Sequence, residues 1–210
     1  MQQPPAPTAD ALLDLAIRHL NAGLRERAKL LCAQAQATQA PHPGVLQLLA
    51  LLALQDGDAA MACRHALASL ALRRDHPPTL VLAGSAQQQC GQAQAALLTL
   101  TRAVTLAPEH ADAWFALALA RQDLHDLDGA AQALRRVLQL APQRFDAQLN
   151  LGVVLQEAGQ MAPALQAYGR AMRLHEPSFG RIAHALAAAP FGRLWLSPAA
   201  LRADLLQASA

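Results

Sequence analysis

The sequence predicts an all-α fold in which helical hairpins stack into a solenoid. The first of three observations is a period of 34 residues, which places Pro108 and Pro142 one period apart in "TLAPEHADAW" and "QLAPQRFDAQ". The second is that small residues recur at fixed positions of the period, and the third is that glycine and proline recur where helices must end. A period of roughly 20 to 50 residues is typical of repeat architectures, so an array is expected.

Five repeats fit the period, and each predicts a first helix, a turn and a second helix. In the first helix, positions 4, 7, 8 and 11 of the repeat share one face, and position 8 is always small, which allows close packing. Pro43 and Pro77 open two of these helices, where a missing N–H is no loss. The repeats are 9–42, 43–76, 77–110, 111–144 and 145–178, and their residues at position 8 are Ala16, Ala50, Gly84, Ala118 and Gly152.

The turn and the second helix follow from the next columns of the repeat. A glycine at position 15 supplies the left-handed residue that ends the first helix, except that His125 stands there in repeat 111–144. Position 20 is alanine throughout, so the second helix can approach the first, and proline stops it at or shortly after position 32. The turn glycines are Gly23, Gly57, Gly91 and Gly159, and the alanines are Ala28, Ala62, Ala96, Ala130 and Ala164.

Both ends of the chain depart from the repeat. Residues 1–8 predict a disordered, proline-rich leader, and residues 179–189 predict a capping helix with Ile182, Ala185 and Leu186 directed at the last repeat. Residues 190–210 predict a short extended segment and a terminal helix over about 198–208, since Ser197 and Pro198 suit an N-cap and a first helical position.

This frame resembles the tetratricopeptide repeat (TPR) family. The family pattern of small residues at positions 8, 20 and 27 with proline at 32 is matched by Gly84, Ala96, Ala103 and Pro108, and the resemblance covers residues 9–178. The family's aromatic at position 11 is absent from every repeat, and the one at position 24 survives only as Tyr168. The resemblance implies a right-handed superhelix with a concave groove that binds peptides.

Positions 5, 6, 9 and 12 would face that groove. Phe115 and Leu149 thus belong to the expected site, whereas Trp114 and Gln148, at position 4, belong to the frame. The expected groove residues are Leu13, Ile17, Leu20, Leu48, Leu51, Leu54, Val81, Leu82, Gln88, Phe115, Leu119, Gln122, Leu149, Asn150, Val153 and Gln156, and Gln47 and Ser85 stand in the same columns.

The contents of the groove indicate an apolar ligand. Its leucine-rich N-terminal half suits an amphipathic helix, and three amides one repeat apart, Gln88, Gln122 and Gln156, could bind the backbone of an extended peptide. The alternative is that these glutamines are only good helix formers. Members that bind chaperone tails clamp a carboxylate with Lys, Arg and Asn, but these columns hold one asparagine and no Lys or Arg, so that ligand class is disfavoured.

Composition and motifs exclude several functions. A net charge of +2 with 15% charged residues disfavours nucleic acid, and no apolar run of about 18 residues predicts a membrane span. The start lacks the features of a secretory signal, so we expect a cytoplasmic protein. The sequence contains no HExxH, GxSxG, P-loop or GxGxxG motif, and we expect no enzyme, cofactor or metal.

Three sets of residues could carry chemistry and are interpreted as structural. Cys32, Cys63 and Cys90 are an odd number without CxxC pairing, so we expect buried thiols. His42, His76 and His110 all fall at position 34, and because adjacent helical layers stand about 8 to 10 Å apart they cannot share one ion. Arg102, Arg136 and Arg170 all fall at position 26, either on a solvated convex face or opposite an acidic partner.

Two functional hypotheses remain. The first is a non-catalytic adaptor, scaffold or chaperone-like protein that holds an apolar peptide or helix of another protein in its groove. The alternative is an accessory or assembly subunit of an enzyme complex that acts through its C-terminal segment, where Phe191 and Trp195 could contact a partner or form a homodimer. A third arrangement places the last helix in the groove of its own or a neighbouring chain.

Overall fold

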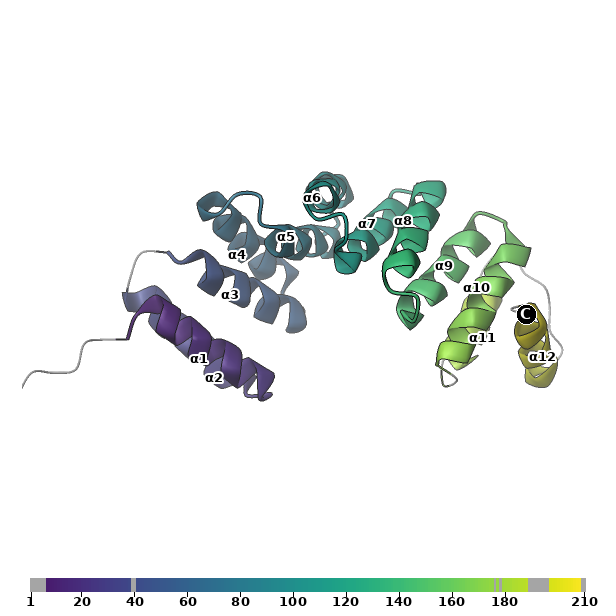
Figure 1. The fold of residues 1–210 in the computed structure, drawn as a ribbon, viewed down its shortest axis with the longest axis horizontal. Helices are drawn as coiled ribbons and strands as arrows, with labels where there is room; N and C mark the ends of the chain where they lie inside the picture. The colour runs from purple at the N-terminus through teal and green to yellow at the C-terminus, as the bar shows by residue number, and fades with distance from the viewer. Residues whose placement is uncertain (1–6, 39–40, 176, 178, 189–196, 209–210) are drawn as a thin grey trace, which may run out of the picture. The chain divides into compact units, whose positions relative to one another are not determined.

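The computed structural model describes residues 7–38, 41–175, 177, 179–188 and 197–208, and all regular secondary structure within these ranges is helical. The predicted fold class is confirmed, because consecutive helices pair into antiparallel hairpins of a TPR-like solenoid (Figure 1). The described helices are α1 (Ala9–Asn21), α2 (Arg25–Thr38), α3 (Pro43–Gln55), α4 (Ala59–Leu72), α5 (Pro77–Gln89), α6 (Ala93–Leu106), α7 (Ala111–Asp123), α8 (Leu127–Leu140), α9 (Phe145–Glu157), α10 (Met161–Leu174), α11 (Phe179–Ala188) and α12 (Pro198–Ala208).

The chain divides into two compact bodies. The N-terminal body, Met1–Leu106, contains the hairpins α1–α2, α3–α4 and α5–α6, and the C-terminal body, Ala107–Ala210, contains α7–α8, α9–α10 and the last two helices. In both bodies the first helix of each hairpin begins at the residue that opens a 34-residue repeat: Ala9, Pro43, Pro77, Ala111 or Phe145.

Left-handed residues end the first helix of each hairpin, as the glycine column predicts. Gly23, Gly57, Gly91 and Gly159 have φ angles of 76°, 80°, 73° and 72°. His125 takes the same conformation, with φ at 58°, although a side chain disfavours it. The turn geometry is therefore set by the hairpin, and glycine is the residue that adopts it without strain.

Small residues at position 8 admit the large side chains of the second helix. A Cβ atom on Gly152 would lie 2.5 Å from Cδ1 of Tyr168, which is fully buried, and a Cβ on Gly84 would lie 2.4 Å from Cγ of Leu100. Both distances are far below van der Waals contact. Close packing of the paired helices thus depends on the absence of a side chain at these two positions.

The three histidines at position 34 are N-cap residues, which accounts for their recurrence. His42 Nδ1 accepts a hydrogen bond from Val45 N at 3.3 Å, and His110 Nδ1 accepts one from Ala113 N at 3.2 Å. His76 instead pairs with the hydroxyl of Thr79, 2.8 Å from Nδ1. In His42 and His110 the side chain thus satisfies a donor that the helix itself leaves unpaired.

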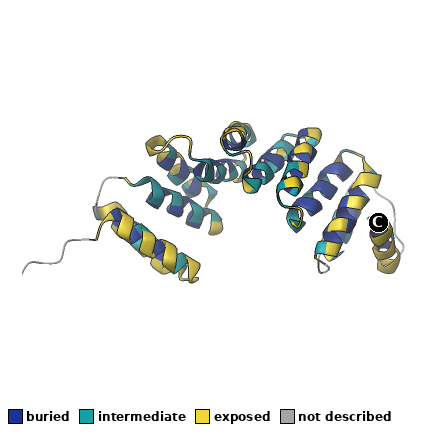
Figure 2. Cartoon of the chain, viewed as in Figure 1, coloured by how far each residue is buried: buried dark blue, intermediate teal, exposed yellow. Residues whose placement is uncertain are grey.

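Helices α11 and α12 cover the C-terminal end of the array. In α11, Ile182 and Leu186 are buried and Ala185 packs against the same core. The terminal helix α12 packs against α10 and buries Leu201 and Leu205. It therefore covers the second helix of the last hairpin, and the arrangement in which it occupies the chain's own groove is wrong. Figure 2 shows the resulting contrast between buried α9 and α10 and the largely exposed α1.

Candidate peptide-binding site

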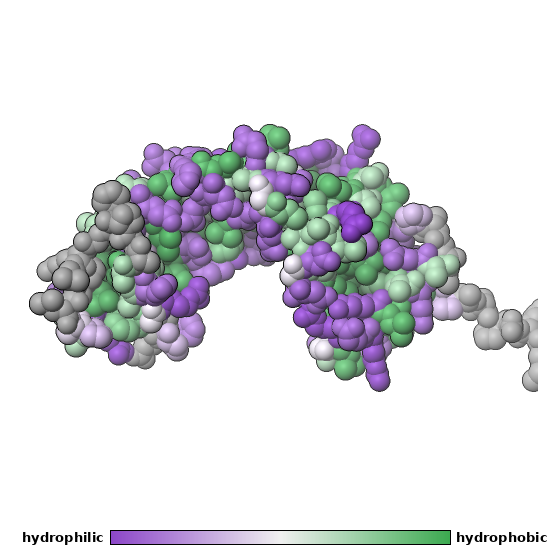
Figure 3. Space-filling model, turned by 180° about the vertical axis from the view of Figure 1, so that it is seen from behind, coloured by the Kyte–Doolittle hydropathy of each residue, from purple (hydrophilic) through white to green (hydrophobic). Residues whose placement is uncertain are grey.

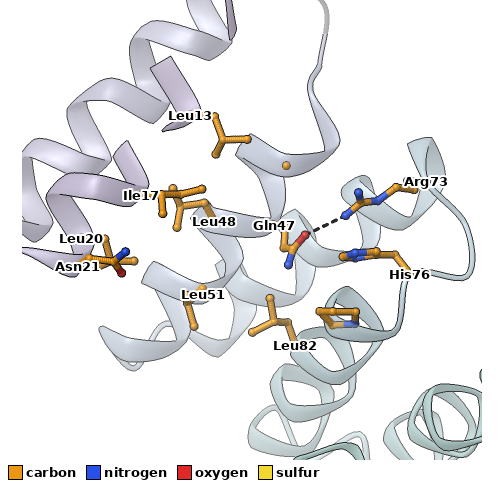
Figure 4. A pocket seen from close by; sticks show the side chains of 12 residues that line it. Leu13, Ile17, Leu20, Asn21, Gln47, Leu48, Leu51, Arg73, His76 and Leu82 are labelled. Carbon is orange, nitrogen blue, oxygen red and sulfur yellow. Dashed lines mark hydrogen bonds between the residues drawn. The ribbon is translucent and has the colours of Figure 1, made fainter. Parts of the chain in front are cut away.

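The N-terminal body contains an apolar hollow of about 560 Å³ between α1, α3 and α5. Figure 4 shows its side chains, most of which come from the first helix of each of the three hairpins. Six of the predicted groove residues line it together: Leu13, Ile17, Leu20, Leu48, Leu51 and Leu82.

The first helices approach closely at one edge of this hollow. A Cβ on Gly44, in the first turn of α3, would lie 2.6 Å from Cδ2 of Leu13 on α1. Leu48 is buried, whereas Ile17 is 41% exposed. The hollow therefore has a buried floor and an apolar wall that remains in contact with solvent.

Polar side chains lie along another part of the hollow. Arg73, the C-cap residue of α4, donates a hydrogen bond from Nη2 to Oε1 of Gln47 at 3.1 Å, and His76, the N-cap residue of α5, lines the hollow with them (Figure 4). Burial, and secondarily the charge of Arg73, lowers the pKa of His76. This part of the hollow offers cationic and neutral hydrogen-bonding groups beside the apolar surface.

Three predicted groove residues of this body lie outside the lining of the hollow. Leu54, Val81 and Gln88 are all half-buried, and Leu54 packs against the small core of Ala53, Ala62 and Ala86. These residues do not extend the apolar surface of the hollow.

In the C-terminal body, Arg144 covers the predicted groove aromatic. Its guanidinium carbon stands 4.5 Å from the centre of the Phe115 ring, and its nitrogens contact Asp112 Oδ1 at 2.5 Å and Asp146 Oδ1 at 2.9 Å. A cation stacked on the ring is attracted by its electron-rich face. Phe115 thus contributes to an Arg–Asp cluster and not to an open apolar surface.

Two further expectations for this body are wrong. Leu149 and Gln156 were expected to face the groove, but they are 5% and 2% exposed. Gln156 accepts a hydrogen bond from Tyr168 Oη at 2.7 Å and donates one to the Ala185 carbonyl at 3.4 Å. The capping helix α11 therefore occupies the place where Gln156 would have met a ligand.

The other predicted groove residues of this body are half-buried, and two of them form hydrogen bonds within the protein. Gln122 donates to both carboxylate oxygens of Glu157 at 3.0 Å, and Asn150 donates to the backbone carbonyl of Asp146 at 2.7 Å. Leu119 and Val153 are half-buried. The amide row does not present three equivalent groups to a peptide backbone, because Gln122 and Gln156 already hydrogen-bond within the protein.

The sequence analysis did not predict that Arg73 and His76 line the hollow or that Arg144 covers Phe115. A signal for Arg144 was present, because it replaces the histidine of position 34 and is flanked by Asp112 and Asp146 at position 2 of successive repeats. Arg73 and His76 are in the connection between repeats, which the groove columns leave out. Phe191 and Trp195, the expected C-terminal contact residues, lie outside the described part of the chain.

The cysteine expectation is met in only one of three cases. Cys32 is buried, and burial raises its pKa to about 11, whereas Cys63 is half-buried and Cys90 is exposed. Within the described ranges, no group of three or more His, Cys, Asp and Glu side chains is placed to hold a metal ion. None of the described helices is both long enough and apolar enough to cross a membrane.

Comparison with known proteins agrees with the fold. A tetratricopeptide repeat family model matches residues 80–144 and 115–178. Among solved structures, MamA residues 41 to the end from Desulfovibrio magneticus RS-1 has a TM-score of 0.71 at 22% identity, covering 80% of this chain and 96% of that one. TTC0263, a thermophilic TPR protein in Thermus thermophilus, gives 0.67 at 20% identity, covering 86% and 100%. No curated protein matches the chain significantly.

A third solved structure, YrrB, is described as a TPR protein with an unusual peptide-binding site. It has a TM-score of 0.69 at 20% identity, and the match covers 84% of this chain and 91% of that one. Together the family match and the fold show that this chain is a tetratricopeptide repeat protein. Such proteins generally mediate protein–protein interactions and are typically non-catalytic.

Proposed function

We propose that this protein is a non-catalytic interaction module that binds an apolar segment of another protein in the hollow between α1, α3 and α5. One observation carries the proposal: the hollow brings six apolar groove residues together in the N-terminal body. Transfer of one leucine-sized side chain from water to such a surface contributes about 1.5 to 3 kcal/mol. Two or three such side chains on a partner would together contribute about 3 to 9 kcal/mol, which is set against the entropy cost of association.

The occupant that fits best is an amphipathic helix. Helices bind in grooves through apolar side chains spaced three and four residues apart, and the apolar wall of the hollow is built from the first helices of three successive hairpins. Arg73, Gln47 and His76 would then meet polar or acidic groups beside the apolar face of the partner. That YrrB is described as having a peptide-binding site is consistent with this class of ligand.

The experiment uses two aspartate substitutions on the same hairpin. Ile17→Asp places a charge in the hollow, whereas Leu30→Asp places the same charge on α2, where Leu30 is 60% exposed. Peptides are selected on the wild-type protein from a phage-displayed random library, and the dissociation constant of the best peptide is measured by fluorescence anisotropy. Ile17→Asp should weaken binding about 30-fold, which corresponds to about 2 kcal/mol, and Leu30→Asp should not.

Point substitutions are the better test because a truncation at Ala189 would remove the buried Leu201 and Leu205 from the core. Affinity capture from the native cell with the same three baits then identifies the physiological partner. Equal affinity of the peptide for Ile17→Asp and Leu30→Asp, or failure to select any peptide on the wild type, would contradict the proposal.

A further inference from the structure

The C-terminal body contains a second hollow that the groove columns do not include. Two adjoining spaces of about 440 and 210 Å³ share Pro142, Gln148 and Arg170, and they are lined by the end of α8, the following turn, α9 and the end of α10. Leu138 and Leu151 form part of the apolar wall. On the face shown in Figure 3, apolar and hydrophilic side chains are likewise interspersed.

The charged side chains among the described lining residues of this hollow are all arginines. Arg135, Arg170 and Arg173 line it, and no acidic side chain is among its lining residues in the described chain. Arg102 and Arg136, which precede Arg170 at position 26, contact Asp75 and Glu109. Arg170 and Arg135 form no such ion pair with any described residue, so their charges are uncompensated at the hollow.

A buried amide provides the second, independent observation. Gln148, at position 4 of α9, lines both spaces and is only 7% exposed, yet its Oε1 accepts no hydrogen bond from the described residues. Buried polar atoms are almost always paired, and an unpaired one requires an explanation. Because this oxygen has almost no accessible surface, the Gln148 amide must rotate toward the hollow before a backbone N–H of a bound polypeptide can donate to it, and an inorganic anion such as chloride has no N–H to donate.

We infer that this hollow binds an acidic segment of a partner protein. Carboxylates of the segment pair with Arg135 and Arg170, its backbone supplies a donor to Gln148, and an apolar side chain packs against Leu138 and Leu151. The competing explanation is that Arg170 and Arg173, near the C-terminus of α10, only stabilise the negative end of the helix dipole. The inference does not depend on the proposed groove, which belongs to the N-terminal body.

The test measures binding of a defined peptide. The probe is the peptide Asp-Leu-Glu-Leu-Asp-Glu with a fluorescent label on its N-terminus and an amidated C-terminus, and its uncharged counterpart is Asn-Leu-Gln-Leu-Asn-Gln with the same two ends. Wild-type protein is compared with Arg135→Gln/Arg170→Gln and with the matched variant Arg64→Gln/Arg102→Gln, which removes the same charge from the N-terminal body. At about 0.15 M salt, where distant exposed charges are largely screened, the first pair should weaken binding about 10-fold and the second should not.

The possible results separate the inference from the helix-dipole explanation. Binding of the acidic peptide in preference to the neutral one, lost only in Arg135→Gln/Arg170→Gln, supports it. Equal weakening by the matched variant, equal binding of the neutral peptide, or no binding to wild type overturns it. Displacement of the peptide by inorganic phosphate at constant ionic strength would assign the hollow to a small anion and would also overturn it.

Discussion

Replacement of Gly152 by alanine tests the packing of the hairpin most sharply. The new Cβ would lie 2.5 Å from both Cδ1 and Cε1 of Tyr168 and 2.9 Å from its Cγ. Ordinary carbon contacts are about 3.5 to 4.0 Å, so the ring or the helix must move by about 1 Å. Tyr168 is fully buried, and its hydroxyl donates to Gln156 at 2.7 Å, so the ring has no free direction in which to move.

The expected change in the free energy of unfolding combines two destabilising effects and one stabilising effect. Overpacking of a core costs about 1 to 3 kcal/mol, and loss of the buried hydrogen bond from Tyr168 to Gln156 costs about 1 to 3 kcal/mol more. Alanine regains about 1 kcal/mol over glycine within a helix. We therefore expect Gly152→Ala to lower the free energy of unfolding by about 3 kcal/mol.

Urea unfolding followed by circular dichroism at 222 nm measures this effect in two backgrounds. Repeat 111–144 has Ala118 and Leu134 at the positions that Gly152 and Tyr168 occupy in the last repeat, so alanine is compatible with leucine there. In repeat 77–110, Leu100 stands so close to Gly84 that an added Cβ would clash, so in a Tyr168→Leu background Gly152→Ala should cost less than in the wild type without becoming stabilising. Gly180→Ala, with no atom within 4 Å of its Cβ, is the control. The same cost of Gly152→Ala in both backgrounds would refute the reasoning.

Two further predictions concern the turns and the histidines. His125→Gly should raise the free energy of unfolding by about 0.5 to 1 kcal/mol, because it relieves the left-handed backbone at φ 58°, and His125→Val should lower it; chemical denaturation of the three proteins checks both signs. Burial lowers the pKa of His65 and of His76 below 6.5 in the folded protein. The stability that their neutral forms contribute is therefore complete above about pH 6.5, and it is lost as the pH falls through the lowered pKa values. The urea concentration at the midpoint of unfolding should accordingly decrease as the pH is lowered from about 7.5 to 5. His76→Asn keeps an N-cap side chain but cannot be protonated, so it should make this decrease smaller. An equal decrease in the variant would contradict the assignment to His76.

The fold was predictable because its determinants are local and repeat in the sequence. Gly23 and its equivalents mark the turn, Pro43 and Pro77 mark a helix start, and small residues at position 8 allow the helices to pack. His125 stands where the other repeats have glycine, yet its backbone adopts the same left-handed conformation, so the rest of the repeat determines the conformation of this turn. Ile182 and Leu186 likewise identified the covering face of α11.

The site was predictable only in part, because a position on a helix does not determine what approaches it from the next element. Leu13, Ile17 and Leu48 meet in one hollow as their columns suggest. Phe115 has an equivalent position, but Arg144 lies over it. Gln156 forms hydrogen bonds with Tyr168 and with the carbonyl of Ala185 in α11, and neither contact follows from the repeat pattern. Repeat periodicity thus predicts where a groove residue stands and not whether a neighbour covers it.

Binding of a peptide in the hollow between α1, α3 and α5 can be measured directly in this chain. The sequence contains two isoleucines: Ile17 is in the hollow, and Ile182 is fully buried in the capping helix. Methyl-labelled isoleucine therefore gives two NMR signals, which an Ile17→Val variant assigns. On addition of the selected peptide, the Ile17 signal should shift while that of Ile182 remains in place. A saturating peptide that leaves the Ile17 signal unchanged would contradict it.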